Sequence, residues 1–218
     1  MSSLLASIVP SRRRLALKGL VGALALVCIP AASARADGLI NTDPCDNATL
    51  TQPFAQFGDS NYYKLVPGGD FEGSMAGWTL THGAKLVTGS EPFGATGSVG
   101  DNSLYLPAGA SVQSPYTCVD FAYPTFRFFV RNNSLLSAML VSVVYKEPLL
   151  GPVTLPLGGP VVLSPKWGPS AQMLTASEVQ TVVNALLARG IPQVALKFTE
   201  VTGSSQIDDI YVDPRMMW

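Results

Sequence analysis

The sequence predicts an all-β domain, a sandwich or barrel of roughly ten short strands. Helical periodicity is nearly absent between residues 37 and 170. In its place, short runs rich in β-branched and aromatic residues alternate between two faces, as half-buried strands do. Glycine and proline separate these runs, and the chain has 20 Gly and 17 Pro among its 218 residues. Both residues are favoured in tight turns between strands.

The first 36 residues are expected to be an export signal and not part of the fold. A cationic patch at residues 12–18 precedes an apolar run at residues 20–29, and a small-x-small site at residues 34–36 places the cut before Asp37. A run of about ten apolar residues is too short to cross a bilayer, which disfavours the alternative of a membrane anchor. The Ser-Arg-Arg-x-Leu order is similar to a twin-arginine signal. We therefore expect a secreted, extracellular protein.

Removing the signal changes the charge balance. The whole chain has a formal net charge of -1, but five of its 14 basic residues and none of its 15 acidic residues lie in the signal. Nine basic residues then face fifteen acidic ones, a net charge of -6. A nucleic-acid binder needs clustered cations, so this function is disfavoured. We also expect no membrane span in the exported chain, since no other stretch is long and apolar enough.

Two cysteines remain after the signal, Cys45 and Cys118. In an exported chain, an even pair most simply forms one disulfide. It would tie an N-terminal arm, residues 37–66, to the sandwich domain, residues 67–218. A zinc site is disfavoured because the chain has a single histidine, His82.

The expected strands follow one another along the chain. Residues 125–131 alternate most clearly, with phenylalanine and valine on one face and Arg127, Phe129 and Arg131 on the other. Two runs near residues 155 and 162 are expected to pair around a Gly-Gly turn. The full set comprises residues 78–81, 85–88, 103–106, 111–113, 125–131, 139–146, 153–157, 161–163, 194–199 and 207–212.

One segment has helical spacing. Thr175 and Glu178 form a capping-box pattern, apolar residues follow at helical intervals, and Gly190 and Pro192 end the run. The pattern predicts an amphipathic helix over residues 176–189, which would pack against an edge or face of the sandwich.

Three short motifs carry a resemblance to a known fold family. Gly69-Asp70-Phe71-Glu72-Gly73 precedes Gly77-Trp78, and a glycine-led Ser-Leu-x-Leu strand and an Ile-Asp-Asp-Ile-x-Val strand follow at residues 100–106 and 207–212. In this order they resemble galactose-binding-like jelly rolls, which include several carbohydrate-binding module families. The whole chain also resembles a group of secreted bacterial proteins. The resemblance implies a jelly-roll β-sandwich, to which the arm and the helix at residues 176–189 are additions.

The resemblance also implies a structural calcium ion. In a jelly roll the first and last strands share an edge, so Glu72 could approach Asp208 and Asp209. Carboxylate oxygens gathered without a basic partner suit Ca²⁺. The alternative is that these residues cap strand ends or pair with lysine and arginine.

For function, the sequence favours binding over catalysis. It contains no nucleophile elbow, P-loop or zinc motif, although paired carboxylates for a minimal hydrolase need only be close in space. The resemblance implies a non-catalytic module for carbohydrate or a cell-envelope polymer, and the alternative is a structural or adhesive protein without a small ligand. Sugar recognition needs aromatic platforms and polar neighbours, for which the candidates are Arg127, Phe129, Arg131, Trp167 and Lys197. Because Phe128 and Phe129 point to opposite faces, something must cover both, and we expect the helix or the arm to do so.

Overall fold

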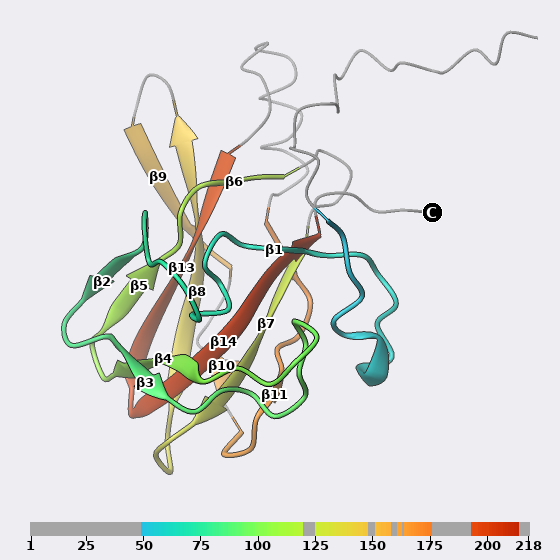
Figure 1. Ribbon diagram of the computed structural model, residues 1–218. Helices are drawn as coiled ribbons and strands as arrows, with labels where there is room; N and C mark the ends of the chain where they lie inside the picture. Colours follow the sequence, from blue (N-terminus) through green and yellow to red (C-terminus); the bar gives the residue numbers. More distant parts are fainter. Residues whose placement is uncertain are drawn as a thin grey trace, which may run out of the picture. The chain divides into compact units, whose positions relative to one another are not determined.

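A computed structural model describes residues 49–119, 125–147, 151–157, 161–162, 164–175 and 193–213. These residues form a jelly-roll β-sandwich of two antiparallel sheets (Figure 1). The first sheet has the order β11 (Gly168–Pro169), β7 (Thr125–Asn132), β14 (Ser204–Asp213), β4 (Asn102–Pro107) and β3 (Lys85–Thr88), with β1 (Lys64–Leu65) on β14 and β12 (Met173–Leu174) on β7. The second has the order β10 (Val161–Val162), β8 (Ala138–Glu147), β13 (Gln193–Thr202), β5 (Ser111–Gln113) and β2 (Thr79–Thr81), with β6 (Thr117–Cys118) on β13 and β9 (Gly151–Pro156) on β8.

The predicted alternation fixes which side chains form the core between the sheets. Every second residue of β7 and of β13 points inward, and the rings of Phe128 and Phe198 meet edge to face with centroids 4.8 Å apart. The all-β prediction is confirmed, and the short strands β1, β6, β11 and β12 are additional to it. The inward residues of the four longest strands are Phe126, Phe128, Val130, Met139, Val141, Val143, Tyr145, Val194, Leu196, Phe198, Ile207, Ile210 and Val212.

The strand pairing differs from the prediction at β9 and β10. The predicted pairing of residues 153–157 with 161–163 is not found among the described residues, because β9 and β10 each pair with β8. The first and last strands are adjacent, since Lys64 pairs with Val212 and Leu65 with Tyr211, but they do not form an edge of the sheet, because β14 lies between β7 and β4. The pairing brings the Asp208-Asp209 segment close to the start of the domain, where Ile210 exchanges backbone hydrogen bonds with Val66 and Gly69.

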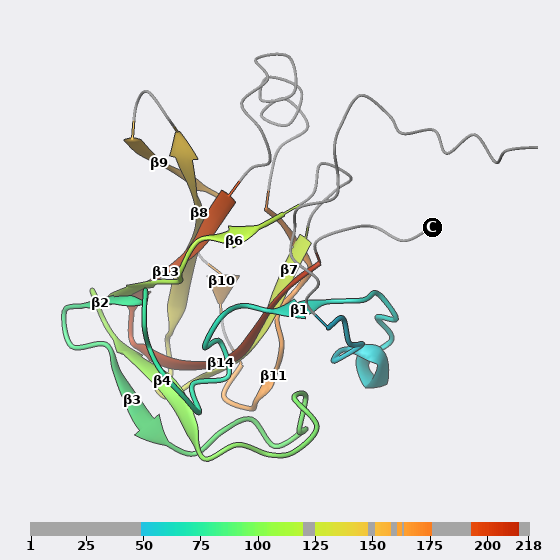
Figure 2. The same ribbon diagram turned by 45° about the horizontal axis from the view of Figure 1, so that its top comes forward.

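The structure describes residues 49–66 of the N-terminal arm, which contain the 3-10 helix Ala55–Phe57. Figures 1 and 2 both show it on the β7–β14 side of the sandwich, away from β2 and β5. A bridge between Thr51 and Tyr63 closes it into a loop, with their backbone groups exchanging hydrogen bonds of 2.9 and 2.7 Å. The arm therefore covers part of the outer face of the first sheet.

Several predictions fall outside the described residues. They concern the signal at residues 1–36, the helix at residues 176–189, and the disulfide, because Cys45 and the side chain of Cys118 are not described. No helix in the described ranges is long and apolar enough to cross a membrane.

Candidate functional site

Phe129 lies under the arm. Its side chain is 0% exposed, and its ring stacks on Phe54 with a centroid distance of 5.2 Å. Phe57 and Phe93 close over it at 5.7 and 5.5 Å. With Tyr63 and Tyr211, these rings form a second apolar cluster outside the sandwich, here called the arm core. Phe129 therefore offers no surface to a ligand, which corrects its prediction as a platform. The arm covers it together with Phe93, which lies in the connection between β3 and β4.

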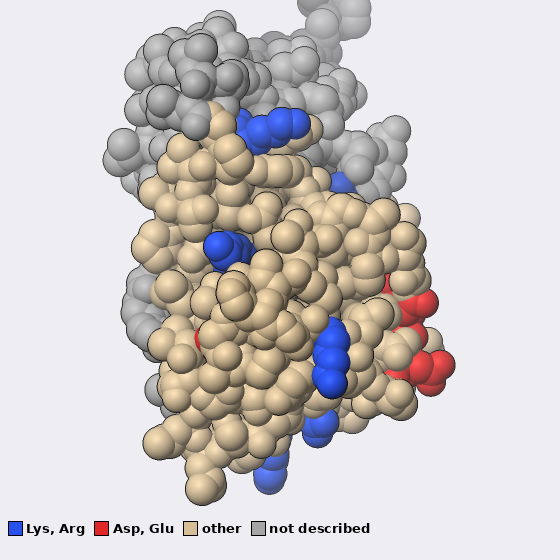
Figure 3. Space-filling view, turned by 90° about the vertical axis from the view of Figure 1, so that its left-hand side faces the viewer, with Lys and Arg blue, Asp and Glu red and all other residues tan. Residues whose placement is uncertain are grey.

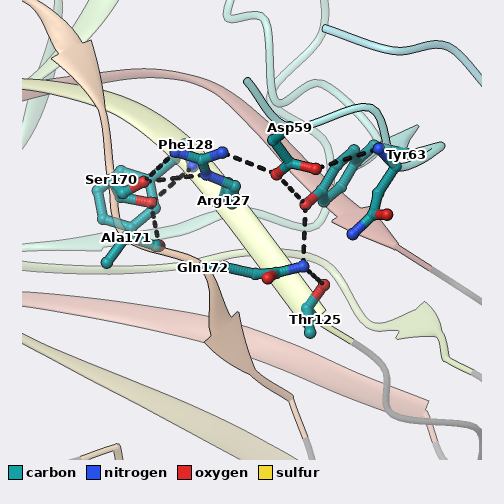
Figure 4. Close-up of polar contacts among 9 residues, drawn as sticks. Asp59, Tyr63, Thr125, Arg127, Phe128, Ser170, Ala171 and Gln172 are labelled. Carbon is teal, nitrogen blue, oxygen red and sulfur yellow. Dashed lines mark hydrogen bonds and ion pairs between the residues drawn. The ribbon is translucent and has the colours of Figure 1, made fainter. Parts of the chain in front are cut away.

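Arg127 ties the arm to the sheet (Figure 4). Its Nη1 donates to Asp59 Oδ2 at 2.7 Å, and its Nε and Nη2 donate to the Ser170 carbonyl at 3.0 and 2.7 Å. Its guanidinium also lies 4.7 Å from the centroid of the Phe54 ring. With its nitrogens engaged in this way, Arg127 is better explained as an anchor for the arm than as a ligand-binding group.

The partner of Arg127 is itself held by several donors. Asp59 accepts hydrogen bonds from the Tyr63 hydroxyl at 2.7 Å and from the Asn61 amide at 3.1 Å. Burial alone would raise the pKa of Asp59, but the hydrogen bonds from Tyr63 and Arg127 outweigh it and lower the pKa. A polar depression of about 440 Å³ opens beside this network, and it is lined by Phe57, Gly58, Asp59, Ser60, Asn61, Arg127 and Gln172.

Beyond the arm core, the outer face of the first sheet carries a row of side chains that are half-buried or exposed, apart from the buried Gln206. Register partners carry a row of side chains from β7 to β3: Arg131 faces Gln206, Gln206 faces Tyr105, and Tyr105 faces Lys85. Arg131 Nε donates to Gln206 Oε1 at 2.6 Å, and its guanidinium lies 5.1 Å from the centroid of the Trp167 ring. We call this set, Trp167, Arg131, Gln206, Tyr105 and Lys85, the arginine row.

The structure thus brings two predicted candidates, Arg131 and Trp167, together. Both are half-buried, as is Tyr105, whereas Lys85 is exposed. Sequence reasoning missed Gln206, Tyr105 and Lys85. Tyr105 had a signal, because it stands between Leu104 and Leu106 in an alternating strand and so points outward.

Lys197 lies on the other side of the sandwich, on the outer face of the second sheet. Its neighbours Leu196 and Phe198 point into the core, so Lys197 points outward between its register partners Gln113 and Ser142. Figure 3 views the molecule from the side of β2 and β5 and shows a mainly uncharged surface, with isolated cationic side chains and acidic ones at one margin. Lys197 therefore forms no common site with Arg131 and Trp167.

Hydroxyl and amide side chains surround Lys197. Two rows of outward-facing side chains cross β2, β5, β13 and β8. In one of these rows the Thr81 and Ser111 hydroxyl groups lie 2.9 Å apart. Apart from the buried Ser142, these residues are half-buried or exposed. We call them the hydroxyl face; its first row is Thr79, Gln113, Lys197 and Ser142, and its second is Thr81, Ser111, Thr199 and Leu140.

Asp208 and Asp209 lie at an irregularity in the pairing of β14 with β7, where Asp209 has a positive φ of 45°. Both are buried. Asp208 Oδ2 accepts hydrogen bonds from the Ser90 hydroxyl at 2.7 Å and the Glu91 amide at 3.0 Å. Burial raises the pKa of Asp208 to about 7. Burial, together with the charges of Asp208 and Glu91, raises the pKa of Asp209 to about 9.

Glu72 has partners other than the aspartate pair. Its Oε1 accepts hydrogen bonds from the backbone amides of Asp101 and Asn102 at 2.8 and 2.7 Å, so it caps the start of β4. No group of three or more His, Cys, Asp or Glu side chains within the described ranges is arranged to hold a metal ion. Glu72, Asp208 and Asp209 therefore form no ready-made triad. The carboxyl group beside Asp209 is that of Glu91, and calcium stays a prediction.

Comparison with known proteins bears on the fold. The sequence matches no family model and no curated protein. Solved structures with a similar strand arrangement include carbohydrate-binding modules. The CBM22-1 xylan-binding domain from Paenibacillus barcinonensis Xyn10C has a TM-score of 0.46 and 13% identity, covering 68% of this chain and 94% of that one.

Two further solved modules are similar to the same extent. A xylan-binding domain from CBM 22 has a TM-score of 0.44 and 16% identity, covering 73% of this chain and 99% of its own. CtCBM11 has a TM-score of 0.44 and 11% identity, covering 71% and 96%. At such identities the likeness concerns the fold, and no site residue is carried over from it.

Proposed function

We propose that this protein is an exported, non-catalytic module that binds a neutral polysaccharide on the hydroxyl face. The observation that carries the proposal is the pair of outward-facing rows across β2, β5, β13 and β8, with one ammonium group near their centre. Export is supported by the signal-like composition of residues 1–36.

The chemistry of this face fits sugar hydroxyl groups. Serine and threonine hydroxyls and the Gln113 amide can each donate and accept hydrogen bonds, and the Lys197 ammonium adds three donors. A polyol needs donors and acceptors close together, and these rows supply both without a carboxylate. At about 4.8 Å between strands, four strands span roughly 14 Å, which is enough for several consecutive sugar rings.

A non-catalytic role is supported by the burial of the carboxyl groups of Asp208, Asp209 and Glu91, which lie together at the irregularity in β14. A hydrolase of the glycosidase type needs two carboxyl groups on either side of an accessible bond. Asp208, Asp209 and Glu91 are all buried, so their carboxyl groups do not face a polysaccharide chain.

The proposal is tested by binding to a panel of insoluble and gel-embedded neutral polysaccharides. The test variants are Lys197→Ala and Gln113→Ala, and the control is Lys166→Ala, an exposed lysine outside the hydroxyl face. We expect retention by at least one polysaccharide and about tenfold weaker binding for Lys197→Ala. This follows because a hydrogen bond from a charged donor contributes roughly 1.5–3 kcal/mol. Gln113→Ala should weaken binding about fivefold.

Two outcomes would overturn the proposal. One is that no neutral polysaccharide retains the protein. The other is that Lys197→Ala binds as tightly as Lys166→Ala. Failure on the whole panel would favour the alternative of a structural or adhesive protein.

A further inference from the structure

We propose that the arginine row is a second binding site, one that takes the carboxylate groups of an acidic polysaccharide such as a polyuronate. The arginine row lies on the outer face of the first sheet, whereas the hydroxyl face lies on the second sheet, and the two share no residue. The two sites would then recognise different ligand chemistries, a neutral chain on one sheet and an anionic chain on the other.

The Arg131 guanidinium is held in a fixed orientation. Its Nε donates to Gln206 Oε1 at 2.6 Å, and its Cζ lies over the Trp167 ring, 5.1 Å from the centroid. Gln206 is itself 95% buried, with 5% of its surface exposed, so the acceptor that aligns Arg131 is part of the sheet. Its terminal Nη groups have no hydrogen-bond partner among the residues that the structure describes. A guanidinium aligned in this way presents a planar pair of donors that matches a carboxylate.

This fixed orientation distinguishes Arg131 from Arg127 on the same strand. Arg127 uses Nε, Nη1 and Nη2 within the protein, and its partner Asp59 already supplies a carboxylate. Arg131 has a neutral partner and keeps its full positive charge available. Because the alignment already exists in the free protein, little conformational entropy is lost when a carboxylate binds.

The rest of the row extends the site across the sheet. Tyr105 and Lys85 continue it, and at about 4.8 Å between strands Lys85 is roughly 14 Å from Arg131 along the backbone. A polyuronate has a carboxylate on every sugar ring, so a single chain can reach both cations. The half-buried rings of Trp167 and Tyr105 provide apolar contact for the rings between them.

The local charge also favours an anion. The arginine row contains two cations and no acidic side chain. The next outward residue along β14 is Asp208, which is buried and turns its carboxyl group toward Ser90 and Glu91. The row is therefore a local cationic patch, although acidic residues slightly outnumber basic ones in the chain as a whole.

The test uses sodium polygalacturonate and, as a matched neutral ligand, its methyl ester, with affinity measured by titration calorimetry. The variants are Arg131→Gln, which removes the charge, and Arg131→Lys, which keeps the charge but removes the planar pair of donors. Lys166→Gln serves as the control, because it removes an exposed cation outside the row. Melting temperature verifies folding, and the exposed Lys85→Gln replaces Arg131→Gln if that variant does not fold.

We expect the protein to bind polygalacturonate and to bind its methyl ester at least tenfold more weakly. Arg131→Gln should weaken polygalacturonate binding at least tenfold, Arg131→Lys and Lys85→Gln about threefold to fivefold, and Lys166→Gln less than twofold. Equal affinity for the acid and the ester, equal affinity of Arg131→Gln and Lys166→Gln, or no binding of polygalacturonate would overturn the proposal. Lys197→Ala should leave this binding unchanged, which separates the two sites.

Discussion

Phe54 is predicted to be the main apolar anchor of the arm, beside the Arg127–Asp59 ion pair, and Phe54→Ala tests this. Phe54 is 0% exposed, and its ring lies 5.0 Å from Tyr63, 5.2 Å from Phe129 and 5.7 Å from Tyr211, measured between centroids. Truncating a buried phenylalanine typically lowers the free energy of unfolding by about 3–5 kcal/mol. For a chain of this size, that corresponds to a melting temperature lower by roughly 6–20 °C.

The expected result is local as well as global. Once Phe54 is truncated, the arm should detach before the sandwich unfolds, and limited chymotrypsin digestion should cut within residues 49–63 first. Tyr62→Ala is the control, because Tyr62 is an aromatic residue of the same arm that is 40% exposed. A double-mutant cycle with Phe129→Ala should be clearly non-additive, since the two rings stack. A shift no larger than that of Tyr62→Ala, or full additivity with Phe129→Ala, would refute the reasoning.

The buried carboxyl groups of Asp208, Asp209 and Glu91 lead to two further predictions. Because burial raises the pKa of Asp208 to about 7 and that of Asp209 to about 9, the folded state holds protons that the unfolded state releases above about pH 4. In the presence of a chelator, the free energy of unfolding should therefore fall as pH rises from 5 to 9, by about 1.4 kcal/mol per pH unit for each extra proton that the folded state binds. Asp209→Asn should make the free energy of unfolding depend less steeply on pH. A melting temperature that rises over this range would contradict this assignment. At pH 8, calcium should raise the melting temperature of the wild type but not of Asp209→Asn, because a cation can take the place of the proton between Asp209 and Glu91. A wild-type melting temperature that changes neither on chelation nor on calcium addition would contradict the calcium prediction.

Most of the fold could be predicted because the strands have a strict period of two. In β7, the alternation of Phe126, Phe128 and Val130 with polar or aromatic neighbours shows which side chains face the core, and the structure agrees. The same pattern indicated that Phe129 needs a cover. The pairing partners could not be predicted, since a short apolar run such as residues 161–162 carries no information about the strand it will join. For this reason β9 and β10 were expected to pair with each other, whereas both join β8.

The candidate site was predictable only in part, for a related reason. Alternation indicates that Arg131 and Lys197 point outward, but it does not say to which sheet each strand belongs. The arginine row exists because the registers of β7, β14, β4 and β3 place four residues side by side, and those residues are far apart in sequence. Likewise, Glu72 lies beside the start of β4, and Glu91 lies beside Asp209. The conformation of the loops determines which of the two glutamates is near Asp209, and this cannot be predicted from the local sequence.

Trp167 links the arm to the proposed anionic site. Its ring packs against the arm core on one hand and lies under the Arg131 guanidinium on the other. The arm therefore does more than cover Phe129, because it also supports the surface on which Arg131 is aligned. Lys197 has no such dependence, since it lies on the outer face of the other sheet. An arm that detaches should consequently disturb binding of an acidic polysaccharide while leaving the hydroxyl face intact, which is the physical reason for treating the two faces as separate sites.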